Sequence, residues 1–197
     1  MKPKLSFCLF FFFLFMGGGI SQVRAQDWAI KTNAIYDATA TVNLGIEVGI
    51  APKWTIDVSG NLNAWSTKNR TRWKHWLVQP EARYWFCDRF SRHFVGAHLI
   101  GGAFNFGAIK NNLSFLGTDF SLLTKQRYQG YSYGAGVAYG YAFALSKHLN
   151  LELEAGFGYM YLDYETYNCS DCGRKTGEDT HHYVGPTKAA VNLVFLF

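Results

Sequence analysis

The strongest constraint on the fold is an alternation of apolar and polar residues that continues over unusually long segments. In 149–162 one face is apolar and the other carries polar residues and glycines: Leu149, Leu151, Leu153, Ala155, Phe157, Tyr159 and Tyr161 against Asn150, Glu152, Glu154, Gly156 and Gly158. A period of two is the pattern of a β-strand with one apolar face. Because an average strand has only ~5–6 residues, this length favours an architecture of long, tilted strands.

Eight segments carry the pattern: 28–37, 42–50, 54–64, 75–86, 93–106, 131–145, 149–162 and 188–197. Their lengths suit the ~9–11 residues that a tilted strand needs to cross a bilayer. Short connections at 51–53, 87–92 and 146–148 alternate with longer ones at 66–73, 107–129 and 168–182. The periplasmic turns and outer loops of bacterial barrels differ in length in this way. We therefore predict an all-β fold, an eight-stranded antiparallel transmembrane β-barrel with up-and-down meander topology.

Aromatic residues and one proline add detail to this prediction. Two groups of aromatic residues predict girdles at the two membrane interfaces: Trp54, Tyr84 and Trp85 on the turn side, and Trp65, Trp76, Tyr131 and Tyr161 on the loop side. Pro80 lies in the middle of a predicted strand and cannot donate a hydrogen bond to a neighbour, so we expect a bulge or a broken pair there. The alternation in 93–106 is ambiguous, and we place His98 on the polar face.

Residues 1–25 have the organisation of a secretory signal peptide. Lys2 and Lys4 precede an apolar stretch, and Val23 and Ala25 occupy the small-residue positions before a cleavage site. We expect cleavage after Ala25 and a single mature domain over 26–197. Cleavage would remove Lys2, Lys4 and Arg24 but no acidic residue, which lowers the net charge from +5 to +2. The basic charge of the precursor therefore does not indicate a nucleic-acid partner. No later apolar run approaches the ~18–20 residues of a membrane helix, which excludes a helical membrane protein.

The polar face of the predicted strands carries many charges. The predicted lumen network has three bases and five acids: Lys31, Glu47, Asp57, Glu81, Arg83, Glu152, Glu154 and Lys188. The interior of an eight-stranded barrel is narrow enough for side chains to fill. Charges there must pair with one another or keep water. The network is therefore either a salt-bridged structural plug or the lining of a narrow path for protons, ions or solutes.

Two cysteines and two histidines in the last long connection leave two alternatives. Cys169 and Cys172 form a C-x-x-C pair that His181 and His182 follow. Two thiolates and an imidazole are zinc ligands, whereas an oxidising compartment favours a disulfide between the cysteines. Cys87 is the odd thiol of the mature chain.

The predicted outer rim is basic near 66–73. Lys68, Arg70, Arg72 and Lys74 have no acid between them. Such bases suit the phosphates of lipopolysaccharide, and ordinary rim residues whose stems lie along apolar surface are the alternative. We predict outer-membrane lipid and lipopolysaccharide as partners.

Catalytic signatures are weak. Barrel enzymes combine a histidine with a serine or an acid near the outer rim. His75 could approach Ser66 or Ser132, but neither serine lies in a motif such as G-x-S-x-G. We assign no catalytic residue and no cofactor.

Six segments carry a family resemblance: Lys31–Asn33 with Tyr36–Ala38, Asn43–Glu47, Lys74–Trp85, Tyr133–Gly136, Cys169–Gly173 and Gly185–Ala189. They resemble a Bacteroidetes family catalogued as a domain of unknown function, which consists of small outer-membrane β-barrels, some encoded near fimbrial genes. The resemblance covers nearly all of the mature chain. It implies the barrel, the organism class and a link to surface appendages, and it implies no catalytic residue.

The sequence therefore predicts a monomeric outer-membrane barrel with a structural or interaction role at the bacterial surface. Fimbrial or other surface assembly is the context that the resemblance implies. An acyl hydrolase acting on outer-membrane lipid and a narrow passive channel are the alternatives.

Overall fold

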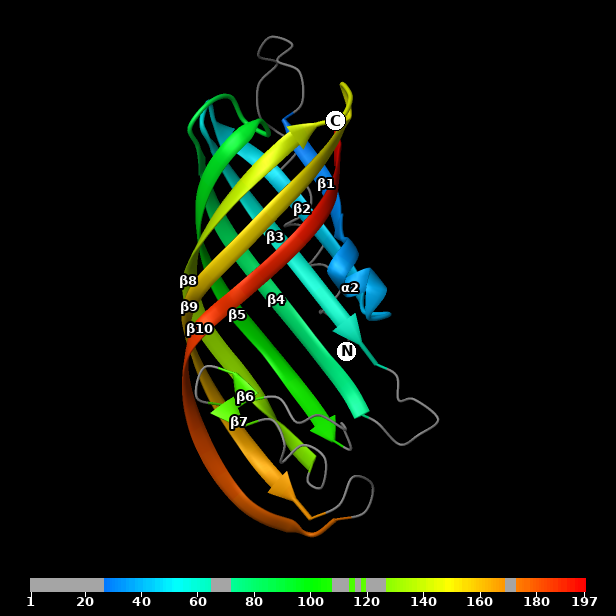
Figure 1. Cartoon of the computed structure of the whole chain (residues 1–197), viewed down its shortest axis with the longest axis vertical. Helices are drawn as coiled ribbons and strands as arrows, with labels where there is room; N and C mark the ends of the chain where they lie inside the picture. Colours follow the sequence, from blue (N-terminus) through cyan, green and yellow to red (C-terminus); the bar gives the residue numbers. More distant parts are fainter. Residues whose placement is uncertain (1–26, 65–71, 108–113, 116–117, 120–126, 169–172) are drawn as a thin grey trace, which may run out of the picture.

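The computed structural model shows eight antiparallel strands in a closed meander (Figure 1) and describes residues 27–64, 72–107, 114–115, 118–119, 127–168 and 173–197. The barrel strands are β1 (Trp28–Asn33), β2 (Val42–Ala51), β3 (Trp54–Asn63), β4 (Arg72–Trp85), β5 (Arg92–Gly107), β8 (Arg127–Ala144), β9 (Leu149–Tyr167) and β10 (Lys175–Leu196). Helix α2 (Ala34–Ala38) follows β1, and β6 (Ser114–Phe115) pairs with β7 (Thr118–Asp119) in the predicted connection at 107–129.

The first and last strands close the sheet. Ile30 of β1 pairs with Ile46 on one side and with Phe195 of β10 on the other. All the other barrel strands pair with the strands next to them in the chain, apart from the β6–β7 insertion between β5 and β8. A closed sheet has no edge strand with unpaired backbone groups.

The strands differ greatly in length, so the wall is much taller on one side. Strand β1 has 6 residues, whereas β9 has 19 and β10 has 22. Figure 1 shows β8, β9 and β10 running beyond the end of β1 and helix α2 at the loop end of the barrel. The predicted loop over 168–182 is wrong in this respect, since 175–182 belongs to β10. Polar residues on both faces of that stretch give no alternating signal.

The first predicted strand, 28–37, also ends early. Residues Ala34–Ala38 form α2 instead, because the Asn33 side chain caps the helix by accepting a hydrogen bond from the Ile35 backbone N–H at 3.1 Å. A capped turn competes with further strand pairing.

The broken pair expected at Pro80 is confirmed. Pro80 pairs with Val58 of β3, but pairing between β4 and β5 skips from Val78–Gly101 to Glu81–His98. Proline has no N–H for the ladder. The register is the same on both sides of the gap, so the strand is interrupted without a bulge.

The two faces of the barrel are inverted relative to a soluble protein. Large apolar side chains are exposed on every barrel strand, among them Trp28, Val48, Val58, Val78, Leu99, Val137, Phe157 and Phe195. The interior holds buried polar and charged side chains, including His98. The girdle prediction is wrong for Trp85, which is fully buried: Glu81, Arg83 and Trp85 share the inward parity of β4. Trp54, Trp76 and Tyr131 are exposed, and Trp65 lies outside the described residues.

Within the described ranges, no helix is long and apolar enough to cross a membrane.

Candidate functional site

The centre of the barrel is occupied by the guanidinium group of Arg83, whose side chain is fully buried. Its Nε donates to Glu81 at 2.6 Å, and its Nη2 donates to Glu154 at 2.7 Å. The Nη1 group donates to Glu47 at 2.8 Å and to Glu152 at 3.1 Å. A guanidinium has five N–H donors in one plane, and here they bind carboxylates from three different strands.

Two lysines complete the cluster around Arg83. Lys31 of β1 pairs with Glu47 and lies 3.2 Å from the Asp57 carboxylate. Lys188 of β10 lies 2.7 Å from Glu81 and 3.0 Å from Glu154. The structure thus brings together all eight residues of the predicted lumen network. We call these eight residues the charge cluster.

Small residues on the facing strands make room for the cluster. A Cβ atom on Gly96 of β5 would lie 2.4 Å from Glu81 Oε1, and one on Gly45 of β2 would lie 2.9 Å from Lys31 Cγ. Each glycine therefore lies directly beneath a charged side chain. The glycines of the polar faces are the sequence signal for this arrangement.

On the side of the cluster that faces the short turns, a layer of aromatic side chains, which we call the aromatic floor, closes the barrel. Trp85, Phe90 and Phe94 are buried together, and the Trp85 and Phe94 rings are 4.7 Å apart. The Arg83 guanidinium lies over the Phe94 ring at 4.6 Å, and the Trp85 indole N–H donates to Thr55 at 3.0 Å. This floor was not predicted, because Trp85, a tryptophan at the end of a predicted strand, was placed in a girdle.

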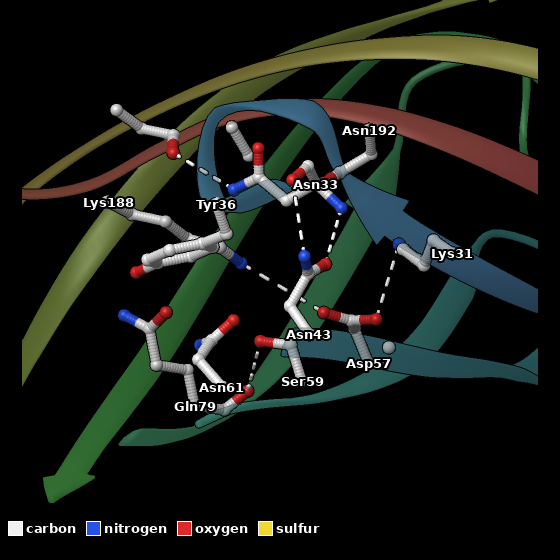
Figure 2. A pocket seen from close by; sticks show the side chains of 13 residues that line it. Lys31, Asn33, Tyr36, Asn43, Asp57, Ser59, Asn61, Gln79, Lys188 and Asn192 are labelled. Carbon is white, nitrogen blue, oxygen red and sulfur yellow. Dashed lines mark hydrogen bonds and ion pairs between the residues drawn. The ribbon is translucent and has the colours of Figure 1, made fainter. Parts of the chain in front are cut away.

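A layer of amide side chains lies on the opposite side of the cluster (Figure 2). Asn33, Asn43, Asn61, Gln79 and Asn192 line a cavity of about 20 Å³ together with Tyr36 of α2. That volume holds roughly one water molecule. The helix, and with it this layer, was missed because α2 falls within a predicted strand.

His98 lies beside the cluster. Its Nε2 is 2.9 Å from the Thr187 hydroxyl, and its Nδ1 is 3.6 Å from a Glu81 oxygen. The cluster itself holds five carboxylates and three bases.

The other predicted site residues fall elsewhere. Cys169, Cys172, Lys68 and Arg70 lie outside the described residues, so the disulfide, metal and lipopolysaccharide hypotheses remain predictions. Arg72 and Lys74 begin β4.

His181 and His182 belong to β10, and His182 Nδ1 lies 2.5 Å from the Tyr159 hydroxyl. Ser132 is buried in β8, Ser66 lies outside the described ranges, and Cys87 is a free thiol. In the described part of the chain, no three acid, histidine or cysteine side chains gather as a metal site.

These features define a class of protein: a small closed β-barrel with an apolar exterior and an ion-paired interior. The chain belongs to the family described as "protein of unknown function (DUF3575)", whose match spans residues 9–197. No curated protein and no solved structure matches the chain.

Proposed function

We propose that this protein is a small outer-membrane β-barrel of a Gram-negative bacterium, with a structural or interaction role at the cell surface. One observation carries the proposal: the closed sheet exposes large apolar side chains on every barrel strand and buries a cluster of charged side chains in its interior. Contiguous apolar surface of this extent is not left in water by a folded protein. A bilayer is the environment that covers a belt surrounding a whole barrel.

The height of the belt fits a bilayer. On β8 the outward positions are apolar from Tyr131 to Phe143. Twelve residue steps of about 3.3 Å give roughly 40 Å along the strand. At a tilt of ~45° this corresponds to ~28 Å across the membrane, close to the ~25 Å expected for an outer-membrane barrel.

Tyrosine–histidine pairs lie on the turn side and on the loop side of the middle of this belt. His93 Nδ1 is 2.5 Å from the Tyr139 hydroxyl near the short turns, and the Tyr159–His182 pair lies toward the loops. Side chains with an apolar body and a polar tip suit the membrane–water interface.

The filled lumen supports a structural role over a passive channel. The charge cluster, the aromatic floor and the amide layer succeed one another along the axis, and the cavity between cluster and amide layer is only about 20 Å³. A conducting pore needs a continuous water-filled path.

The proposal extends to the finer predictions. It includes the signal peptide over 1–25, a monomeric barrel over 26–197, a Bacteroidetes origin and a fimbrial or other surface-assembly context. It also includes lipopolysaccharide contacts by Lys68, Arg70, Arg72 and Lys74. An acyl hydrolase remains a prediction that no observed geometry favours.

Expression of the full chain in a Gram-negative host tests the proposal. We expect a product shortened at Ala25 that sediments with the outer membrane and migrates faster on gels before boiling than after. In planar bilayers, the same preparation should show no steady conductance. Recovery in the soluble periplasmic fraction would overturn the proposal, and a steady conductance would overturn the structural role.

A further inference from the structure

Two cross-strand rows of side chains cross the outer face of the barrel at its loop end. Pairing of successive strands aligns the first row, Leu62, Trp76, Ala103, Tyr131 and Asp163. We call it the aromatic row. The second row, Lys74, Asn105, Gln129, Glu165 and Glu178, lies two residues farther from the belt. We call it the polar row.

The aromatic row contains a slot. Trp76 and Tyr131 are 47% and 55% exposed, and between them lies Ala103, whose side chain is a single methyl group. Neighbouring strands are about 4.8 Å apart, so the two aromatic side chains stand roughly 10 Å apart on either side of Ala103. One ring in van der Waals contact with both needs about 7–8 Å. The slot therefore has room for one six-membered ring.

Hydrogen-bonding groups surround the slot. Asp163 is exposed at one end of the aromatic row. In the polar row, the Asn105 amide donates to Gln129 at 3.2 Å. Both rows line one cavity of about 580 Å³, which is within the ~300–1,000 Å³ range of small-molecule sites.

The slot lies at the edge of the apolar belt. The next row toward the belt is Val78, Gly101, Tyr133 and Tyr161, with no charged or amide side chain. On the other side, the polar row begins the charged part of the wall. In a bilayer, the slot would lie where hydrocarbon gives way to lipid headgroups.

The charges favour an uncharged sugar over a phosphate. Among the described residues that line the cavity, Asp163, Glu165 and Glu178 are acidic, whereas Lys74 is the one lysine or arginine. Lys175 pairs with both glutamates, and the positive charge of Arg127 also acts on Glu165. Among the described lining residues, this excess of carboxylates disfavours a phosphate inside the slot. Carboxylate and amide groups do hydrogen-bond hydroxyl groups, and aromatic faces pack well against the C–H faces of a sugar ring.

We propose that the slot between Trp76 and Tyr131 binds a sugar ring in the headgroup of an outer-leaflet glycolipid. Trp76 and Tyr131 stack on the two faces of the ring, and Asn105, Gln129 and Asp163 hydrogen-bond its hydroxyls. This inference rests on the proposed membrane placement, and it deepens the lipid partnership by naming the headgroup and the residues that hold it.

Three substitutions test the slot in the refolded full mature chain. Trp76→Leu removes one wall of the slot. Ala103→Leu fills the bottom of the slot without removing any proposed contact. Tyr133→Leu is the matched control, because Tyr133 lies on the same face of the same strand as Tyr131 but one row nearer the belt. All three keep an apolar residue at the surface.

Each variant is inserted into phosphatidylcholine vesicles that contain diglucosyl diacylglycerol, phosphatidylethanolamine or phosphatidylglycerol as the added lipid. Lipid retained on the purified barrel is then counted by native mass spectrometry. We expect enrichment of the diglucosyl lipid, weakened about tenfold by Trp76→Leu and by Ala103→Leu and unchanged by Tyr133→Leu.

Equal retention of all three lipids, or full retention of the glycolipid by Ala103→Leu, would overturn the slot. Gel mobility before boiling reports insertion in the same samples. A barrel that inserts without enriching glycolipid contradicts this inference alone, whereas a barrel that fails to insert contradicts the proposed function as well.

Discussion

Replacing Arg83 by methionine should destabilise the barrel strongly. Arg83 is fully buried and binds four glutamates. Methionine fills similar space but leaves five acids with only Lys31 and Lys188. Breaking a buried ion pair by removing one partner costs about 3–5 kcal/mol. This is a large part of the ~5–15 kcal/mol that stabilises an ordinary domain.

The assay is urea unfolding of the barrel in phospholipid vesicles, followed by tryptophan fluorescence. Arg92→Met is the matched control, since Arg92 is exposed at the start of β5, and it should change the free energy of unfolding by less than about 0.5 kcal/mol.

A second substitution separates lost packing from uncompensated charge. Glu152 binds Arg83, Lys31 and Asn192 in the native cluster, so Glu152→Gln alone should destabilise. In the Arg83→Met barrel the same change lowers the excess of buried negative charge and should stabilise. The coupling free energy should reach about 1–3 kcal/mol. Unchanged stability of Arg83→Met, together with new conductance, would refute the structural plug.

Four further substitutions, one of them a control, test the faces and the packing in the same unfolding assay. Val137→Arg, at a position 66% exposed, should cost roughly 2–4 kcal/mol if that face meets lipid, and a change near zero would contradict lipid contact. Gly140→Ala should cost about 1–3 kcal/mol, because the added Cβ would lie 2.2 Å from Phe94 Cζ. Gly60→Ala is the control, since a Cβ there would have no atom within 4 Å and should not destabilise the packing. Equal effects of the two substitutions would contradict the packed aromatic floor. Trp85→Phe should cost about 1 kcal/mol for the lost indole hydrogen bond, and full stability would show that this bond contributes nothing.

The alternation predicted which side chains face inward because strand parity is local. Arg83 and Glu154 lie far apart in the chain, yet each occupies the polar parity of its own strand, and closure of the sheet brings them into contact. Glycines on the predicted polar faces, such as Gly156, were part of the same signal. The individual ion pairs depend on register between distant strands, which periodicity does not determine.

The errors have local physical causes. Trp85 was placed in a girdle by its residue type, although the parity of Arg83 already directed it inward. The prediction of a strand over 28–37 took no account of the ability of Asn33 to cap a helix. Tyr36 and the amide layer were therefore missed. The N-terminal part of β10, including His182, has polar residues on both faces and therefore resembles a loop in sequence.

A direct test of the membrane-spanning barrel compares the environment of a spin label at Val137 with that of a label at Glu178. Each label is placed on a single introduced cysteine, in a mature chain whose own cysteines are replaced by serine, and the barrel is inserted into vesicles. We expect the label at Val137 to relax with lipid-soluble oxygen and the label at Glu178 to relax with a water-soluble nickel chelate. Strong relaxation at Val137 by the water-soluble chelate would contradict the membrane-spanning barrel.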